Sequence, residues 1–165
     1  MRSLKWSIAH AAFVNEIDDE HKEIFEAVSN LQTALSGGGS AEQPGKSVER
    51  LVTAITEHFA HEERLMRAAS YPSIRWHKQQ HDHAHKRVAE FVRRMQEGDG
   101  QAGFDLIVYL TSWLHDHTRL ADRMLGAFLR IQRLCKVTLH AGTRPADACT
   151  WVDATGARFD PLKKV

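Results

Sequence analysis

Residues 57–66 read EHFAHEERLM and carry two polar side chains on a helix face that is otherwise apolar. Traced at steps of three and four, this face consists of Val48, Leu51, Val52, Ile55, His58, Phe59, Glu62, Leu65 and Met66. Such a stripe predicts an amphipathic helix packed on a core. Burying His58 and Glu62 there costs free energy unless both find partners. The stretch therefore indicates a buried polar site.

Three further segments repeat the same helical period. Their inner positions are Ile17, His21, Ile24, Phe25, Val28, Leu31 and Leu35, then Ile74, His77, His81, Ala84, Val88, Phe91, Val92 and Met95, then Ile107, Leu110, Leu114, His117, Ala121, Met124, Leu125 and Phe128. Asp18 is predicted to cap the first helix. Glycine- or proline-marked loops near 36–40, 69–73 and 97–103 separate the segments. The pattern predicts an all-α fold, an antiparallel up-down-up-down four-helix bundle.

The helical stripe is lost from about Leu134. Residues 150–159, TWVDATGARF, read either as a small hairpin turning near Thr155–Gly156 or as an irregular tail. We expect two parts, a four-helix bundle with an N-terminal arm over 1–133 and an irregular C-terminal extension over 134–165.

Composition narrows the class of function. The 165 residues include 22 basic and 21 acidic side chains, a formal net charge of +1, which argues against a nucleic-acid or anionic-membrane surface. No apolar run is long enough to span a bilayer, and the start MRSLKWSIAH has no apolar signal region. A cytoplasmic protein is the expectation. The 11 histidines are more than a chain of this length usually has, and their positions decide whether they could bind a metal. We expect His10, His61 and His115, which lie off the stripes, to be exposed.

The polar residues on the stripes have the spacing of metal ligands. His58 with Glu62, and His77 with His81, stand at i and i+4, about 6 Å apart on one helix face. The full candidate set is His21, His58, Glu62, His77, His81, His117 and Asp122. Five imidazoles and two carboxylates exceed a tetrahedral zinc site and suit two metal ions with bridging carboxylates and an open position. This donor set favours iron.

Asp122 stands five residues after His117, about 140° round an ideal helix. Either the two side chains flank the site, or the helix is distorted between them. We predict a local π-bulge, a feature frequent at functional sites.

The motifs VNEIDDEHKEIF (14–25), HFAHEERLM (58–66), YPSIRWHKQQH (71–81) and WLHDHTRLAD (113–122) resemble the hemerythrin family in its single-domain bacterial form. The resemblance implies a non-haem di-iron centre that binds O2 reversibly. It implies ligation of one iron by His77, His81 and His117 and of the other, with the open position, by His21 and His58. Glu62 and Asp122 would bridge the two ions beside an oxo or hydroxo group.

The resemblance also implies an apolar O2 pocket, for which the candidates are Ile24, Phe25, Phe59, Met66, Trp113 and Leu114, with Thr118 beside them. Thr118 stands where the family usually has a bulky aliphatic residue. Its hydroxyl is expected to hydrogen-bond the O2-derived ligand or to admit water, and so to hasten autoxidation.

Neutral imidazoles stabilise high iron oxidation states less than carboxylates do. The histidine-rich set therefore favours O2 binding, for transport, storage or sensing, over oxidation, and we expect no catalytic residue and no enzyme activity. Two alternatives stay open. One is a di-iron oxidase or peroxide-handling enzyme on the same bundle. The other is a signalling module that reports O2 or redox state to a protein partner.

Overall fold

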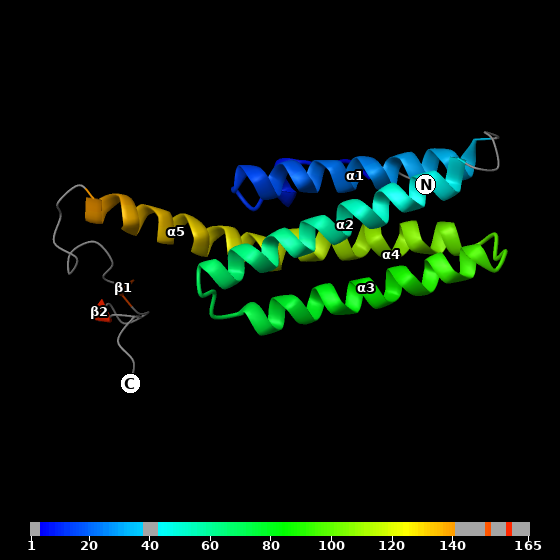
Figure 1. Ribbon diagram of the computed structural model, residues 1–165. Helices are drawn as coiled ribbons and strands as arrows, with labels where there is room; N and C mark the ends of the chain where they lie inside the picture. The colour runs from blue at the N-terminus through cyan, green and yellow to red at the C-terminus, as the bar shows by residue number, and fades with distance from the viewer. Residues whose placement is uncertain (1–3, 38–42, 141–150, 153–157, 160–165) are drawn as a thin grey trace. The chain divides into compact units, whose positions relative to one another are not determined.

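The computed structural model describes residues 4–37, 43–140, 151–152 and 158–159 (Figure 1). The elements are η1 (Ile8–His10), α1 (Asn15–Ser36), α2 (Gln43–Ala68), α3 (Ile74–Gln96), α4 (Ala102–His117), the π-helix η2 (Thr118–Asp122), α5 (Arg123–His140), β1 (Trp151–Val152) and β2 (Arg158–Phe159). The chain divides into two compact units, Met1–Ala127 and Phe128–Val165. The first unit holds the helical bundle.

Helices α1 to α4 pack as a ring in chain order (Figure 1). Helix α1 packs on α2 and α4, and α3 packs on the same two neighbours. Short connections, such as residues 69–73 between α2 and α3, make consecutive helices antiparallel. The predicted up-down-up-down bundle is confirmed. Within the described residues, no helix is both long and apolar enough to cross a membrane.

The core is built from the predicted stripes. One cluster of buried side chains draws on all four helices: Ile24, Phe25, Val28 and Leu31 of α1, Val48, Leu51, Ile55 and Phe59 of α2, Ala84, Val88 and Phe91 of α3, and Leu106, Ile107, Leu110 and Leu114 of α4. Burial of these apolar groups is the main favourable contribution to the fold. The predicted polar residues lie on the same stripes, so they share these helix faces with the apolar core.

The predicted helix cap at Asp18 is wrong. Helix α1 begins at Asn15, so Asp18 lies in its first turn. The Asp18 side chain instead accepts a hydrogen bond from the backbone N–H of Ala12 at 2.7 Å. Asp18 thus ties the N-terminal arm to α1, a long-range role that helix periodicity does not reveal.

The C-terminal expectation is partly corrected. Helix α5 continues to His140, beyond the predicted loss of helix at Leu134. No glycine or proline interrupts the chain between Ala127 and His140, and the first, Gly142, follows just after. Further on, Trp151 pairs with Phe159 in an antiparallel ladder, as the hairpin reading predicted, although its turn lies outside the described residues. The division into domains at residue 133 stays a prediction.

The N-terminal arm is held against the start of α5. The Arg123 guanidinium donates to the backbone carbonyls of Ala9 and Ala11, at 3.1 and 3.3 Å. Close by, the arm's backbone runs over Gly126, where a Cβ atom would lie 2.0 Å from the Ala12 carbonyl oxygen. Only glycine lets the two segments approach this closely.

Replacing Gly126 with alanine should therefore destabilise the protein. The added methyl group forces the Ala12 backbone away, at a cost of about 1–3 kcal/mol, typical of overpacking. Chemical denaturation of the metal-free protein measures the change. Gly100→Ala is the matched control, because no atom lies within 4 Å of a Cβ at that position. Equal stability of the two variants would contradict the close approach.

Candidate metal centre

The seven predicted ligands all lie in the interior of the bundle. His21 comes from α1, His58 and Glu62 from α2, His77 and His81 from α3, His117 from the end of α4, and Asp122 from the end of η2. None of these residues is more than 5% exposed. Four helices and the π-helix thus deliver a polar cluster into an apolar surrounding.

Asp122 lies between the imidazoles of different helices. Its Oδ1 atom is 3.1 Å from His77 Nε2 and 3.1 Å from His117 Nε2. Its other oxygen, Oδ2, is 3.1 Å from His21 Nε2. The two oxygens of the Asp122 carboxylate therefore lie next to two separate groups of imidazoles.

Glu62 has a similar central place. Its Oε2 atom is 3.2 Å from both His77 Nε2 and His81 Nε2. The Nε2 atom of His58, one helical turn earlier on α2, is 3.8 Å from the same oxygen. All five imidazoles thus turn Nε2 toward the two carboxylates.

These short contacts do not have hydrogen-bond geometry. Within the described residues, the ring nitrogens of His21, His77 and His81 and the carboxylate oxygens of Glu62 and Asp122 are buried without a hydrogen-bond partner. Buried polar atoms are rarely left this way. Imidazole nitrogens and carboxylate oxygens that converge without bonding one another are suited to binding metal ions between them. The residues present therefore fit the metal centre that the sequence predicts.

The ligand atoms fall into two overlapping groups, each with all atoms within 4.8 Å of one another. The first consists of Glu62, His77, His81, His117 and Asp122, and the second of His21, His58, Glu62 and Asp122. Both groups contain the same two carboxylates. This overlap is what two metal ions bridged by two carboxylates require, with three imidazoles on one side and two on the other.

The π-helix η2 explains how Asp122 reaches the cluster. It occupies Thr118–Asp122, between the two ligands that an ideal α-helix would separate. Its i→i+5 hydrogen bonds widen the turn by about one residue, so a side chain five positions on returns to the same face. The predicted π-bulge is confirmed.

Electrostatics within the cluster keep the carboxylates charged. Burial raises the pKa of Glu62, and Asp122 adds to that effect, but the imidazoles outweigh both and hold the pKa well below its usual range. Burial likewise raises the pKa of Asp122, which His117 and its neighbours bring well below normal. Burial lowers the pKa of His77, but Asp122 and Glu62 outweigh it and raise that pKa to about 9. The pKa of His81 is lowered by burial.

A second layer of contacts surrounds the ligands, and the sequence alone did not reveal it. Glu20 Oε2 lies 2.9 Å from His58 Nδ1, and Glu20 Oε1 lies 2.6 Å from His61 Nδ1. Burial raises the pKa of Glu20, but its hydrogen bonds with the two histidines outweigh this and lower it. The expected exposure of His61 is wrong, since its side chain is only 24% exposed.

His10 is a second correction. It is buried in the N-terminal arm, 7% exposed, and its ring lies 4.8 Å from that of Phe25. The expectation of exposure failed because the arm folds back on the bundle. His115 is exposed as expected.

The predicted pocket residues are nearly all buried. Ile24, Phe25, Phe59 and Leu114 belong to the apolar core cluster, and Trp113 packs against it. The Phe59 ring stacks on His81 at 3.9 Å, and the Trp113 ring stacks on His117 at 4.2 Å. Two aromatic rings therefore shield ligand imidazoles of the three-histidine group.

Met66 and Thr118 are buried too, but they are not members of that cluster. The Thr118 hydroxyl donates to the backbone carbonyl of Leu114 at 2.8 Å. Its one proton is engaged by the helix, so it is not a donor to a ligand in this conformation. A threonine that bonds the preceding turn in this way commonly bends a helix, and here it stands at the first residue of η2.

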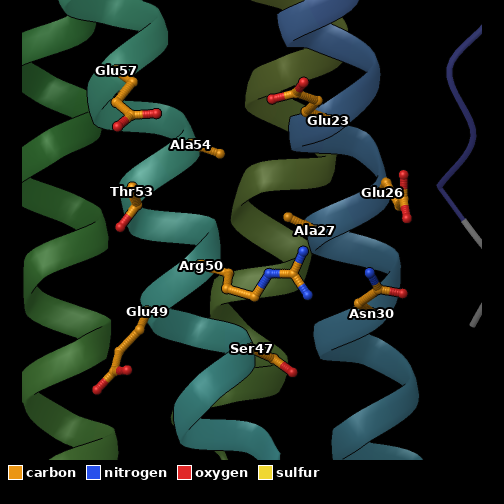
Figure 2. A pocket seen from close by; sticks show the side chains of 10 residues that line it. All are labelled: Glu23, Glu26, Ala27, Asn30, Ser47, Glu49, Arg50, Thr53, Ala54 and Glu57. Carbon is orange, nitrogen blue, oxygen red and sulfur yellow. The ribbon is translucent and has the colours of Figure 1, made fainter.

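A surface hollow of about 680 Å³ lies away from this cluster, between α1 and α2 (Figure 2). Four glutamates line it, Glu23, Glu26, Glu49 and Glu57, and Figure 2 shows them turned in different directions around Arg50. They do not converge on a common point. The buried cluster, and not this hollow, has the geometry of a ligand site.

Comparison with known proteins agrees with the cluster. Residues 12–129 match the family model described as the hemerythrin HHE cation binding domain. A bacteriohemerythrin from Stenotrophomonas maltophilia (strain R551-3) is 33% identical, with 96% of this chain and 99% of that protein covered. A bacteriohemerythrin from Pseudomonas aeruginosa (strain LESB58) is 35% identical over 74% of this chain and 78% of that protein.

Solved structures show the same fold. The crystal structure of a wild-type hemerythrin superposes with a TM-score of 0.71 at 26% identity, covering 78% of this chain and 98% of that one. The family model spans residues 12–129, which include all seven candidate ligands. By its sequence, its fold and the family model it matches, this chain belongs to the hemerythrin family.

Proposed function

We propose that this protein binds O2 reversibly at a di-iron centre held by the seven buried ligands, with His77, His81 and His117 on one iron and His21 and His58 on the other. A pair of ferrous ions supplies the electrons that reversible O2 binding requires. The carboxylates of Glu62 and Asp122 connect the two halves of the site. Membership of the hemerythrin family supports this assignment.

The single observation that carries the proposal is the placement of the two carboxylates. Glu62 and Asp122 belong to both groups of ligand atoms, and Asp122 presents a different oxygen to His77 and to His21. The first group offers five protein ligands and the second four. The two-histidine side thus offers fewer protein donors, so with iron bound an external ligand would add on that side.

The protein groups around the centre favour binding over oxidation. Five neutral imidazoles and only two carboxylates leave the centre poor in anionic donors. The apolar side chains of Phe25, Phe59 and Leu114 exclude water and limit the delivery of protons to the ligand. Together these groups support the release of O2 unchanged.

Metal analysis and optical spectra test the proposal. Protein reconstituted anaerobically with Fe(II) should hold about two irons per chain, since the ligands divide into two groups. A visible absorption band should appear with O2 and fade under argon over repeated cycles. His81→Ala should lower the iron content, whereas His83→Ala, at an exposed position on the same helix, should not.

Sustained turnover of hydrogen peroxide or of an organic reductant, without a reversible band, would contradict O2 binding as the function and favour an enzyme. Two irons retained by His81→Ala with an unchanged spectrum would contradict the ligand assignment.

The metal-free protein should lose stability as the pH rises from about 6.5 to about 9. The pKa of His77 is raised from 6.5 to about 9 by Asp122 and Glu62, against the effect of burial. A histidine with a raised pKa stabilises the fold fully below 6.5, and this contribution is lost as the pH rises through 9. Thermal unfolding of the metal-free protein across this range measures it. The His77→Gln variant should show a smaller decline, and a wild-type stability that rises over the range would oppose the assignment.

A further inference from the structure

Glu20 on α1 lies between two histidines of α2. One carboxylate oxygen, Oε2, is 2.9 Å from Nδ1 of the buried His58, and the other, Oε1, is 2.6 Å from Nδ1 of His61. His58 and His61 are three residues apart, so they stand on adjacent turns of one helix face. The chain of contacts runs from the partly exposed His61 through Glu20 to a ligand of the two-histidine group.

Among the described residues, the outer ring nitrogens of His77 and His81 in the three-histidine group have no hydrogen-bond partner. The outer nitrogen of His81, Nδ1, lies 3.6 Å from Glu63 Oε1, beyond hydrogen-bond distance. Glu63 is also shared with cations, at 3.5 Å from Lys78 Nζ and 3.4 Å from Arg67. Within the part of the chain that the structure describes, His58 is therefore the candidate ligand with an outer carboxylate at hydrogen-bond distance.

The Glu20 side chain needs a second contact to stay in place. It is 29% exposed, so its carboxylate has room to rotate toward water. A single hydrogen bond to His58 leaves one oxygen free to do so. The N–H donated by His61 engages that oxygen, and the two bonds together fix both the plane and the direction of the carboxylate.

We propose that His61 is a positioning residue for the two-histidine half of the centre, because it holds the Glu20 carboxylate on His58 Nδ1. A proton fixed on His58 Nδ1 leaves Nε2 with its lone pair turned toward Glu62 and the centre. A negatively charged acceptor at Nδ1 also makes the imidazole a stronger electron donor. His61 thus tunes iron retention and reduction potential at the side where O2 binds. This inference rests on the proposed function.

The alternative is that His61 only ties α1 to α2. The two roles differ in what they change. A contact that only holds α1 to α2 changes the stability of the metal-free protein but not the release rate or the reduction potential of bound iron. A positioning role alters the release of iron and its reduction potential even where stability is unchanged.

The test uses His61→Leu, which removes the donor, and His61→Asn, which keeps an N–H near the position of Nδ1. For each diferrous protein we would measure the rate of iron release to a chelator, the reduction potential, and the melting temperature after metal removal. His61→Leu should release iron about tenfold faster, as expected for loss of an outer contact to a ligand, and raise the reduction potential. His61→Asn should stay near wild type. His83→Leu, at an exposed position on α3, is the control.

A double-mutant cycle with Glu20→Ala identifies the route of action. If His61 acts through Glu20, adding His61→Leu to Glu20→Ala should produce no further change in iron release. Additive effects would overturn the route, and wild-type release and potential in His61→Leu would overturn the positioning role, whatever its melting temperature. Failure of the wild type itself to bind iron and O2 would overturn the proposed function, and the inference with it.

Discussion

Removing seven polar side chains, the candidate metal ligands, from water in the middle of a helical bundle is the constraint on which the rest of this structure depends. Carboxylates and imidazoles lose hydration when they are buried, and the cost is large unless they are paired or bind a metal. Here Glu62 and Asp122 stand among five imidazoles, at 3.1 to 3.2 Å from the nearest of them. Mutual attraction offsets part of the cost in the metal-free protein. Metal ions bound between these side chains would compensate the rest of that cost.

The π-helix η2 connects the buried polar cluster to the N-terminal arm. It returns Asp122 to the face of His117, and so completes both groups of ligands with one residue. The residue that follows, Arg123, bonds the backbone of the N-terminal arm, and Gly126 allows the arm to pass closely. One short segment therefore carries a candidate ligand that both groups share and also anchors the N-terminal arm. A change in the winding of η2 would disturb both.

The two halves of the centre differ in what supports them. Aromatic rings stack on His81 and His117, ligands of the three-histidine group. On the two-histidine side, a hydrogen-bonded carboxylate reaches His58 from the outside and is itself held by His61. The first arrangement excludes water, and the second orients a ring and adds negative charge. The two groups of candidate ligands therefore have different surroundings.

Sequence periodicity was enough to predict most of the bundle and the six candidate ligands that lie on the stripes, because burial on a helix leaves a repeat of 3.6 residues. The misfit of His117 and Asp122 with that repeat was enough to predict the π-helix. The cap at Asp18 and the exposure of His10 were predicted wrongly, since the N-terminal arm bonds one and buries the other. The helical stretch beyond Leu134 was missed, although no glycine or proline interrupts it before Gly142.

By itself, the sequence determined most of the side chains that face the core, since burial on a helix repeats along the chain, although Met124, which that repeat places on the inner face, is 45% exposed. The tertiary structure decided how the ligands divide into two groups, and which outer residues support them. Glu20 lies 38 residues from His58 and 41 from His61, on another helix and off the apolar stripe. No local pattern records such a contact, because it arises only when the packing of α1 on α2 sets the rotation of each helix about its own axis.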